Sequence, residues 1–188
     1  LKDKGWLEEE FEADGIGVEW VHSLGSNKAL ELLNSGSADF GSTAGAAALL
    51  GKINGNPIKS IYVYSKPEWT ALVTRPDTGI SKIEDLKGKP LGLVDPNSTS
   101  GNNVPRFAMD KMGIDPEKYF SNVVYTGSHE NAVIAVQQGQ VEAAFNWWND
   151  ENESMLKRME RKNMAKYDDF RIIFTSDMIV NSPVAYLT

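Results

Sequence analysis

The sequence predicts an α/β fold in which strands alternate with helices. Short β-branched and apolar runs are followed by segments with apolar residues at helical spacing, most regularly from residue 90 onward. Such alternation favours right-handed βαβ units and mainly parallel sheets. With 188 residues, 41% of them hydrophobic, the chain can form one ordinary domain or two small lobes.

The first part of the chain contains helix caps and β-branched runs that place its elements. Ser26 is a typical helix N-cap, and Asn34 and Gly36 are typical of a helix end. The turn residues 75–79, Arg-Pro-Asp-Thr-Gly, mark the expected boundary between two lobes. The elements expected before this turn are a helix ending near Phe11, a strand over 18–21, a helix over 26–33, a very short strand over 38–41, a helix over 42–50, and strands over 58–64 and 70–74.

The second part repeats strand and helix, with polar residues at each helix start. Gly113 marks a helix end, and Asp115 followed by Pro116 opens a short helix. In parallel α/β sheets ligands bind beyond the carboxyl ends of the strands, so these helix starts are expected to converge. The expected elements are a helical turn over 83–86, strands over 91–94, 122–126, 141–145 and 171–174, and helices over 98–112, 127–138 and about 151–162.

The segment 98–101, Ser-Thr-Ser-Gly, is the leading candidate for ligand binding. Three adjacent hydroxyls lie between a predicted strand and a predicted helix. The first N–H groups of a helix have no intrahelical acceptor and carry partial positive charge, so a phosphate-like, phosphonate or sulfonate group would satisfy them. Ser and Thr also cap helices that bind nothing. Taken alone, the tetrapeptide favours the cap.

Charge and composition exclude several classes of protein. A net charge of −7 and the lack of a long Lys/Arg cluster argue against a nucleic-acid partner. No apolar run approaches the roughly 18 to 20 residues that span a bilayer. The N-terminus lacks the apolar core of a signal peptide. Because the chain has no cysteine, disulfides and thiolate sites are excluded.

Enzyme motifs are incomplete. Residues 41–45, Gly-Ser-Thr-Ala-Gly, imitate a nucleophile elbow, but its Ser/His/acid set is missing and the chain has only His22 and His129. His129 lacks the second histidine of a zinc site, and no G-x-x-x-x-G-K-[ST] phosphate loop occurs. We therefore expect a protein that is not an enzyme and that uses no cofactor or metal.

Six motifs occur in a distinctive order and spacing. They are 33–43 (Leu-Asn-Ser-Gly-Ser-Ala-Asp-Phe-Gly-Ser-Thr), 85–89 (Asp-Leu-Lys-Gly-Lys), 95–101 (Asp-Pro-Asn-Ser-Thr-Ser-Gly), 113–117 (Gly-Ile-Asp-Pro-Glu), 126–129 (Thr-Gly-Ser-His) and 135–139 (Ala-Val-Gln-Gln-Gly). In this succession the chain resembles the phosphonate/phosphite-binding proteins of ABC importers. Its first 90 residues also resemble the aliphatic sulfonate and taurine binding proteins, a related branch of the same fold.

The resemblance implies a fold and a set of lobes. The fold is a two-lobed, periplasmic-binding-protein-like α/β fold of type II, with a mainly parallel sheet flanked by helices in each lobe and a hinged cleft. Lobe 1 would comprise residues 1–74 and 177–188, and lobe 2 residues 75–176. The family's first strand and C-terminal helices are expected to lie beyond these 188 residues.

The resemblance also implies roles for individual residues. The hydroxyls and N–H groups of 98–100 would hold the oxygens of the anion, together with His129. Asp150, with Asn149 beside it, matches the region that holds the ligand's amine in aminophosphonate binders. Ser182-Pro183 stands where the family has an acidic residue before proline, which weakens the case for an amine. The expected site residues are Ser98, Thr99, Ser100, His129, Asn149, Asp150, Ser42, Thr43, Trp69 and Ser182.

Further expectations come from the residues themselves. The dipole of its helix should disfavour protonation of His129, so we expect a neutral hydrogen-bond donor; an idle, solvated ring is the alternative. Adjacent side chains on a strand alternate, so only one of Trp147 and Trp148 can face the cleft. Trp69, just before a strand, either faces the cleft or packs at the hinge.

The implied function is a solute-binding protein of an ABC importer that captures a small phosphonate, phosphite or phosphate-like anion. Its partner would be the transporter permease, in the periplasm or, with a lipid anchor, outside a Gram-positive cell, after removal of an upstream export leader. The alternatives are an aliphatic sulfonate or taurine binder of the same fold and the ligand-sensing domain of a regulator. The pyrimidine synthase family of this fold needs a cysteine-rich motif that the chain lacks.

Overall fold

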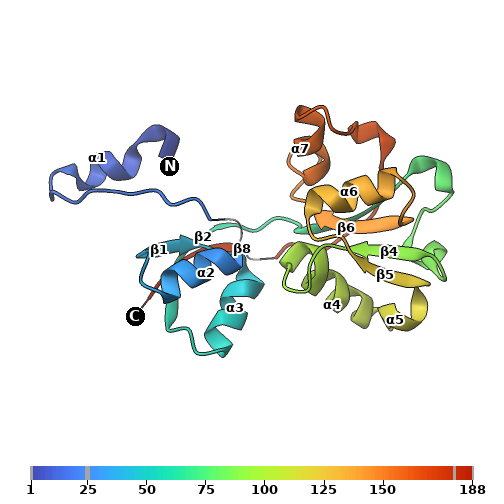
Figure 1. Ribbon diagram of the computed structural model, residues 1–188, viewed down its shortest axis with the longest axis horizontal. Coiled ribbons are helices and arrows are strands. Elements are labelled where there is room, and N and C mark those ends of the chain that lie inside the picture. Colours follow the sequence, from blue (N-terminus) through green and yellow to red (C-terminus); the bar gives the residue numbers. More distant parts are fainter. Residues whose placement is uncertain (1, 24–25, 180, 188) are drawn as a thin grey trace.

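The computed structural model describes residues 2–23, 26–179 and 181–187. Two lobes, each with its own sheet, are joined by two extended segments (Figure 1). The first lobe contains α2 (Ser26–Asn34), β1 (Phe40–Ser42), α3 (Gly45–Ile53), β2 (Ile58–Ser65) and β8 (Asn181–Leu187). The second lobe contains β3 (Thr70–Thr74), η2 (Pro76–Thr78), η3 (Ile83–Leu86), β4 (Pro90–Leu93), η4 (Thr99–Asn103), α4 (Val104–Lys111), α5 (Pro116–Tyr119), β5 (Asn122–Tyr125), α6 (His129–Gln137), β6 (Ala143–Trp147), α7 (Met155–Arg161), η5 (Tyr167–Asp169) and β7 (Arg171–Thr175).

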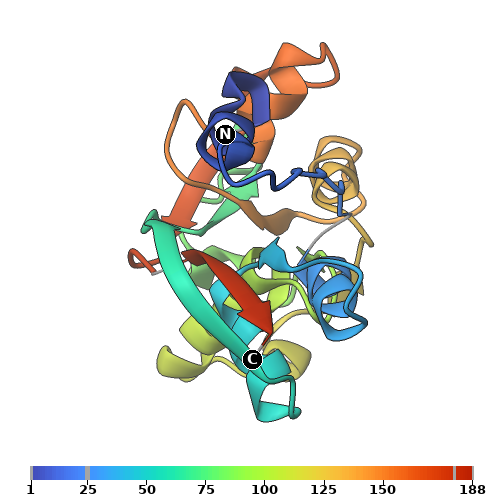
Figure 2. The ribbon, with the colours of Figure 1, turned by 90° about the vertical axis from the view of Figure 1, so that its left-hand side faces the viewer.

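The first lobe is a three-stranded sheet with the order β1-β8-β2, packed against α2 and α3. Ala185 of β8 pairs with Gly41 of β1 and with Ser60 of β2, and β2 and β8 run side by side in Figure 2. The mainly parallel pairing expected for this lobe is not observed. The strand β8 returns from the second lobe and inserts between β1 and β2, so both pairs are antiparallel. The small core consists of Leu30, Leu33, Ala47, Ile58 and Ala185.

The second lobe is a five-stranded mixed sheet with the order β5-β4-β6-β3-β7. The strand β4 pairs in parallel with β5 and β6, as predicted, whereas β3 lies antiparallel between β6 and β7. The boundary expected at residue 75 is therefore wrong, because β3 belongs to the second sheet. The chain crosses between sheets from Ser65 to Thr70 and returns from Thr175 to Asn181. The predicted α/β class is confirmed.

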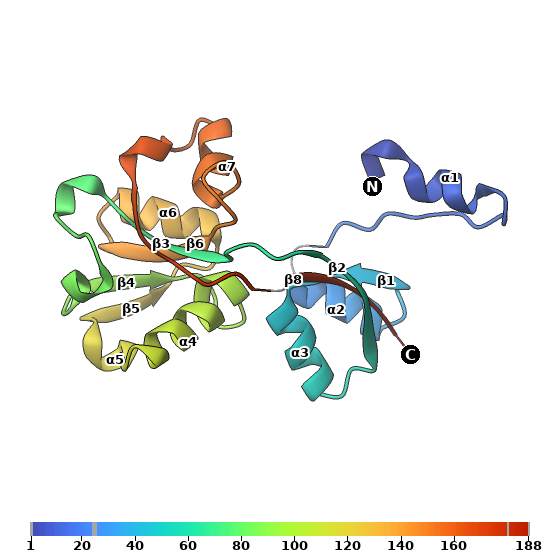
Figure 3. The same ribbon diagram turned by 180° about the vertical axis from the view of Figure 1, so that it is seen from behind.

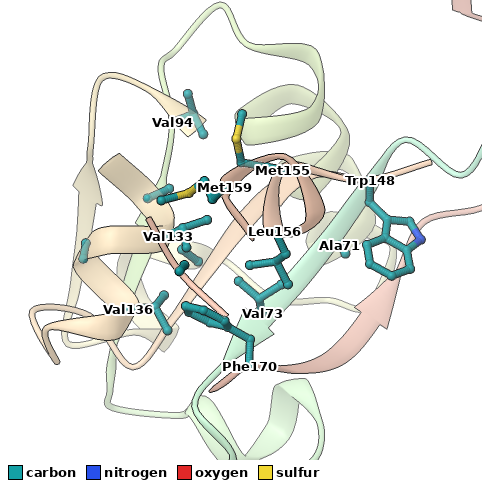
Figure 4. Close-up of a cluster of buried hydrophobic side chains, with 14 of the residues drawn as sticks. Ala71, Val73, Val94, Val133, Val136, Trp148, Met155, Leu156, Met159 and Phe170 are labelled. Carbon is teal, nitrogen blue, oxygen red and sulfur yellow. The ribbon is translucent and has the colours of Figure 1, made fainter. Parts of the chain in front are cut away.

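Helices cover both faces of the five-stranded sheet, α6 and α7 on one side and α4 and α5 on the other (Figure 3). Side chains alternate along the strands. Ala71 and Val73 of β3 therefore face the core beneath α6 and α7, whereas Leu72 faces the opposite core. In the first of these cores Leu156 and Met159 of α7 pack into the same cluster as Val73 (Figure 4). This packing fixes the first residues of α6 and α7 at the edge of the sheet.

Polar caps set the starts of α6 and α7. Ser128 accepts the Asn131 N–H at 3.1 Å, so α6 begins at the Gly-Ser-His motif, as predicted. The helix α7 begins at Met155, later than expected from the sequence. Its N-cap is Ser154, whose Oγ accepts the Lys157 N–H at 3.3 Å.

The helix α1 (Trp6–Glu12) stands apart from both lobes in Figures 1 and 3. It follows a helical turn, η1 (Lys2–Lys4), and none of its residues is buried. The strand expected over 18–21 does not form, since residues 16–23 join neither sheet. Instead, Trp20 Nε1 donates to Glu8 of α1 at 2.6 Å. A β-branched run needs the edge of a neighbouring strand to become a strand, and this segment lies beside none.

Candidate ligand-binding cleft

A cleft of about 400 Å³ lies where the two lobes meet. The first lobe contributes Ser26 and Ala44, at the N-terminal ends of α2 and α3, and the first crossover contributes Trp69. The residues of the second lobe that line the cleft are Asp95, Asn97, Ser98, Thr99, Ser100, His129, Trp147, Met155 and Arg158. The structure thus brings five predicted site residues to one cavity: Ser98, Thr99, Ser100, His129 and Trp69.

Residues 98–100 form the predicted helix start. Ser98 is the N-cap, and its Oγ accepts the Gly101 N–H at 3.0 Å. The π-helical turn η4 follows and continues into α4. The N–H groups of Thr99 and Ser100 lie in the first turn, where a helix offers no acceptor. Capping and anion binding are therefore compatible, since Ser98 caps the helix while Thr99 and Ser100 leave donors at the cleft.

Two residues outside the hydroxyl run hold this helix start against the sheet. Thr70 of β3 is fully buried, and its Oγ1 donates to the carbonyl oxygens of Ser100 and Asn146. Gly101 O accepts the Val94 N–H at 3.0 Å, and a Cβ on Gly101 would overlap the Val94 side chain. Sequence reasoning missed Thr70, because a threonine inside a β-branched run carries no sign of a polar contact.

His129 links the starts of η4 and α6. Its Nε2 lies 3.3 Å from Ser100 Oγ, and its Nδ1 lies 2.9 Å from Oδ1 of Asn146. Asn146, on β6, is 1% exposed, so its amide has no access to solvent. Its Nδ2 donates to the His129 carbonyl oxygen at 3.0 Å, and its Oδ1 accepts the Trp147 N–H at 2.9 Å. The alternative of an idle, solvated histidine is therefore not observed, because the ring is held in a network.

This network favours one tautomer of His129. The two backbone partners fix the orientation of the Asn146 amide, because its NH₂ must face a carbonyl oxygen and its oxygen must face an N–H. The amide oxygen therefore faces Nδ1 at 2.9 Å, and the Trp147 N–H approaches the same nitrogen at the longer distance of 3.3 Å. From the shorter contact we infer that Nδ1 carries the ring proton. In the neutral ring Nε2 is then an acceptor. This inference keeps the expected neutral ring and makes Nε2 an acceptor at the cleft, in place of the expected donor.

Burial lowers the pKa of His129, and the hydrogen bond with Asn146 opposes this effect in part. The folded pKa therefore lies below the unfolded value of about 6.5. Between these two values the unfolded chain binds more protons than the folded one, so this residue destabilises the fold as the pH falls through that window. Above the unfolded pKa its contribution to stability is fully present.

We expect the free energy of unfolding to fall from about pH 7 to about pH 5, and to fall less in His129→Gln. The variant removes the ring that the unfolded chain would protonate. Carboxylates with lowered pKa, such as Glu117 beside Arg106, lose their contribution at lower pH, as they protonate. Urea unfolding at several pH values measures both chains. An identical pH slope in the variant would contradict the assignment.

Arg158 is a functional candidate that sequence reasoning missed. It lies on α7 three residues after Met155, and both line the cleft from one helix face. Its side chain forms no hydrogen bond or ion pair within the part of the chain that the structure describes. The cleft therefore holds a positive charge in addition to the neutral donors predicted. No local pattern distinguishes Arg158 in the sequence, because α7 also carries Lys157 and Arg161.

The adjacent tryptophans divide as predicted. Trp148 is 5% exposed and packs in the core beneath α6 and α7, with its Nε1 donating to Glu68 at 3.2 Å. Trp147 lines the cleft. Trp69 lines it too, and its backbone N–H donates to Ser176 on the second crossover at 3.1 Å. Trp69 therefore combines the two roles considered for it, facing the cleft while its backbone joins the crossovers.

Two predicted residues of the first lobe lie beside the cleft and do not line it. The exposed Ser42 has its Oγ 3.2 Å from the hydroxyl of Tyr64. Thr43 is buried, and its N–H donates to the Pro183 carbonyl oxygen at 3.2 Å. The first contact joins β1 to β2, and the second joins the segment after β1 to β8. A direct role of either residue in binding stays a prediction.

The remaining predicted residues lie elsewhere. Asp150 is exposed, and its Oδ1 accepts the N–H groups of Asn152 and Glu153 at 2.7 and 2.9 Å, which closes the turn before α7. Asn149, in the same turn, is absent from the cleft lining. Ser182 belongs to β8, but its side chain lies outside the described residues. A contact of any of these three with the ligand's tail also stays a prediction.

Within residues 2–23, 26–179 and 181–187, no group of three or more His, Asp or Glu side chains is placed to hold a metal ion. In the same ranges no helix has the length and apolar character needed to cross a membrane.

Comparison with known proteins gives the family. A family model described as "ABC transporter, phosphonate, periplasmic substrate-binding protein" matches residues 5–188. The chain belongs to this family. The phosphonates-binding periplasmic protein of Escherichia coli (strain K12) is 30% identical over 122 residues, 63% of this chain and 34% of that protein. The phosphate-import protein PhnD of Mycolicibacterium smegmatis is 24% identical over 185 residues, 91% of this chain and 56% of that protein.

A solved structure supports the fold. The periplasmic aliphatic sulphonate binding protein SsuA from Escherichia coli superposes with a TM-score of 0.76 at 21% identity, covering 98% of this chain and 59% of that one. The predicted two-lobed fold is confirmed by this similarity. The chain spans between 34% and 56% of the length of the two curated relatives.

Proposed function

We propose that the chain is the ligand-binding part of a solute-binding protein of an ABC importer, and that it captures a small phosphonate, phosphite or phosphate-like oxyanion in the cleft. The observation that carries this proposal is the convergence of Thr99, Ser100, His129 and Arg158 on one cavity at the carboxyl ends of parallel strands. Hydrogen bonds to a charged acceptor contribute about 1.5 to 3 kcal/mol each. A compact anion can accept several of them at once.

The local charge of the cleft, rather than the charge of the whole chain, favours an anion as the ligand. The chain as a whole carries a net charge of −7, so it offers an anion no long-range attraction. Selectivity must then be local, and it comes from the helix dipole at the start of η4 together with the guanidinium of Arg158, which forms no hydrogen bond or close ion pair among the described residues. Asp95 also lines the cleft, and its Oδ1 accepts the Asn97 N–H at 2.8 Å.

Closure of the lobes completes the site in this proposal. The first lobe presents the starts of α2 and α3 to the cleft, where Ser26 Oγ accepts the Ala44 N–H at 2.9 Å. The second lobe presents η4 and α6. A ligand that contacts both lobes binds the closed form more tightly than the open one, and it shifts the hinge equilibrium by that difference. The two crossovers, joined between Trp69 and Ser176, form the hinge.

Isothermal calorimetry with methylphosphonate, 2-aminoethylphosphonate, phosphite, phosphate and an alkylsulfonate tests the function. We expect at least one phosphorus oxyanion to bind, because each presents compact oxygens to the donors of the cleft. Binding of the sulfonate alone would favour the alternative of an aliphatic sulfonate or taurine binder, which the fold of SsuA supports. If none of the five binds at millimolar concentration, the proposal fails.

Replacing Thr99 with valine is expected to weaken anion binding about tenfold, or about 1.4 kcal/mol. The hydroxyl of Thr99 has no partner among the described residues, so its removal should leave the free energy of unfolding nearly unchanged. Thr99→Ser retains the hydroxyl and is the matched control, with affinity close to that of the wild type. Unchanged affinity in the valine variant would mean that this segment serves only as a helix cap.

The wider role follows from the family. We propose the permease of an ABC transporter as the partner that receives the loaded protein, and the periplasm, or the outer face of a Gram-positive cell, as the location. The proposed protein performs no catalysis. A ligand-sensing domain of a regulator would bind the same anions, and it is distinguished by the domains that flank it rather than by the cleft.

A further inference from the structure

The tautomer of His129 has a consequence for the kind of oxyanion that the cleft accepts. Because Asn146 holds the ring proton on Nδ1, the nitrogen beside Ser100 offers a lone pair. An ionised oxygen placed against that lone pair is repelled. An oxygen that carries a proton can donate to it instead.

We propose that Nε2 of His129 accepts a hydrogen bond from a protonated ligand oxygen, so that the cleft selects oxyanions that keep a proton near neutral pH over isosteric sulfonates. This inference rests on the function proposed above. The second ionisation of phosphorus oxyanions lies near neutral pH, at about 6 for phosphomonoesters. Their monoanions therefore retain a P–OH group, whereas a sulfonate has lost its only acidic proton.

The surroundings of the ring oppose the other solution, in which the histidine takes up a proton and becomes a donor. Its contacts are the neutral groups of Ser100, Asn146 and the Trp147 N–H. The ring also sits at the N-terminus of α6, where the dipole disfavours a cation. The neighbouring Glu130 pairs with Lys162 at 2.9 Å, and the charged groups that line the cleft are Asp95 and Arg158.

Asn146 is accordingly a positioning residue for specificity. It is buried on β6, at the position before Trp147, and its side chain reaches the His129 ring and the His129 carbonyl oxygen together. Rotation of the amide would place its NH₂ against the Trp147 N–H and its oxygen against the carbonyl oxygen of His129. Both contacts are repulsive, so the amide orientation and the tautomer are locked together.

Calorimetry with methylphosphonate and methanesulfonate, which share shape and methyl group, tests the selection. We expect methylphosphonate to bind at least about tenfold more tightly. His129→Gln should bring the two affinities together, because an amide can rotate to donate as well as accept. Asn146→Asp, whose carboxylate favours an imidazolium, should strengthen methanesulfonate relative to methylphosphonate. Glu130→Gln, a change beside the ring that leaves these contacts intact, is the control and should keep the wild-type ratio.

Equal affinities in the wild type, or a preference for the sulfonate, would overturn the inference and leave the anion-binding function standing. Absence of binding to both ligands, and to phosphite and phosphate, would instead end the proposed function. The tautomer is measured without a ligand. With His22→Gln, His129 is the single histidine of the chain, and the ¹⁵N shifts of its ring report which nitrogen carries the proton. Protonation at Nδ1 alone is expected, and a proton on Nε2 in the free protein would overturn the inference.

Discussion

Replacing Gly101 with alanine is expected to lower the free energy of unfolding by about 1 to 3 kcal/mol and to weaken anion binding. A Cβ on residue 101 would overlap the Cβ of Val94. Because that atom is bonded directly to the Val94 backbone, a change of side-chain rotamer cannot relieve the overlap. The start of η4 must then move away from β4. Thr99 and Ser100 would move with it, because they occupy the same turn. Chemical unfolding and calorimetry with the best ligand of the panel measure the two effects.

Gly17→Ala is the control for this change. Gly17 has open space around its Cβ position and a backbone that alanine can adopt, so both stability and affinity should remain close to the wild type. If Gly101→Ala behaves like this control, the close approach of η4 to β4 does not position the anion site. A loss of stability with full retention of affinity would show that the turn tolerates a shift.

Much of the fold could be predicted from the sequence, because local signals and tertiary packing agree in the second lobe. The strand over 90–93 is a continuous apolar run, and Ser98 and Ser128 are caps that the structure uses as caps. Each cap follows a strand whose neighbours run parallel to it. Polar helix starts are therefore brought together by topology alone, and residues 98–100 and His129 line one cleft, while their role in binding stays a prediction.

Features that depend on distant partners could not be predicted. The strand β8 forms because the chain returns to pair with β1 and β2, and the segment over 18–21 fails to form a strand because no edge is beside it. Arg158 reaches the cleft because α7 packs against α6 with Leu156 and Met159 turned into the core. The role of His129 changed from donor to acceptor because of Asn146, which is 17 residues away in sequence. No local sequence pattern indicates a contact between residues so far apart in the chain.

Replacing Thr70 with valine is expected to lower the free energy of unfolding by about 1 to 3 kcal/mol and to weaken anion binding about tenfold. The change keeps the shape of the side chain and removes only the hydroxyl. It leaves the carbonyl oxygens of Ser100 and Asn146 without their shared donor in a site closed to water. Both residues belong to the anion-binding wall, Ser100 directly and Asn146 through His129. Ser100 and Asn146 should therefore shift, so that the hydroxyl of Ser100 and the ring of His129 are no longer placed to contact the same anion.

Thr74→Val provides a matched comparison on the same strand. Thr74 is also fully buried, and its Oγ1 donates to the Glu142 carbonyl oxygen at 2.7 Å. It pairs with Ala143, however, at the end of β6 opposite to Trp147, which pairs with Thr70. The loss of stability should be similar in the two variants, whereas the loss of affinity should be confined to Thr70→Val. Equal losses of affinity would mean that binding follows overall stability, and that the hydrogen bonds of Thr70 have no specific part in holding the anion site.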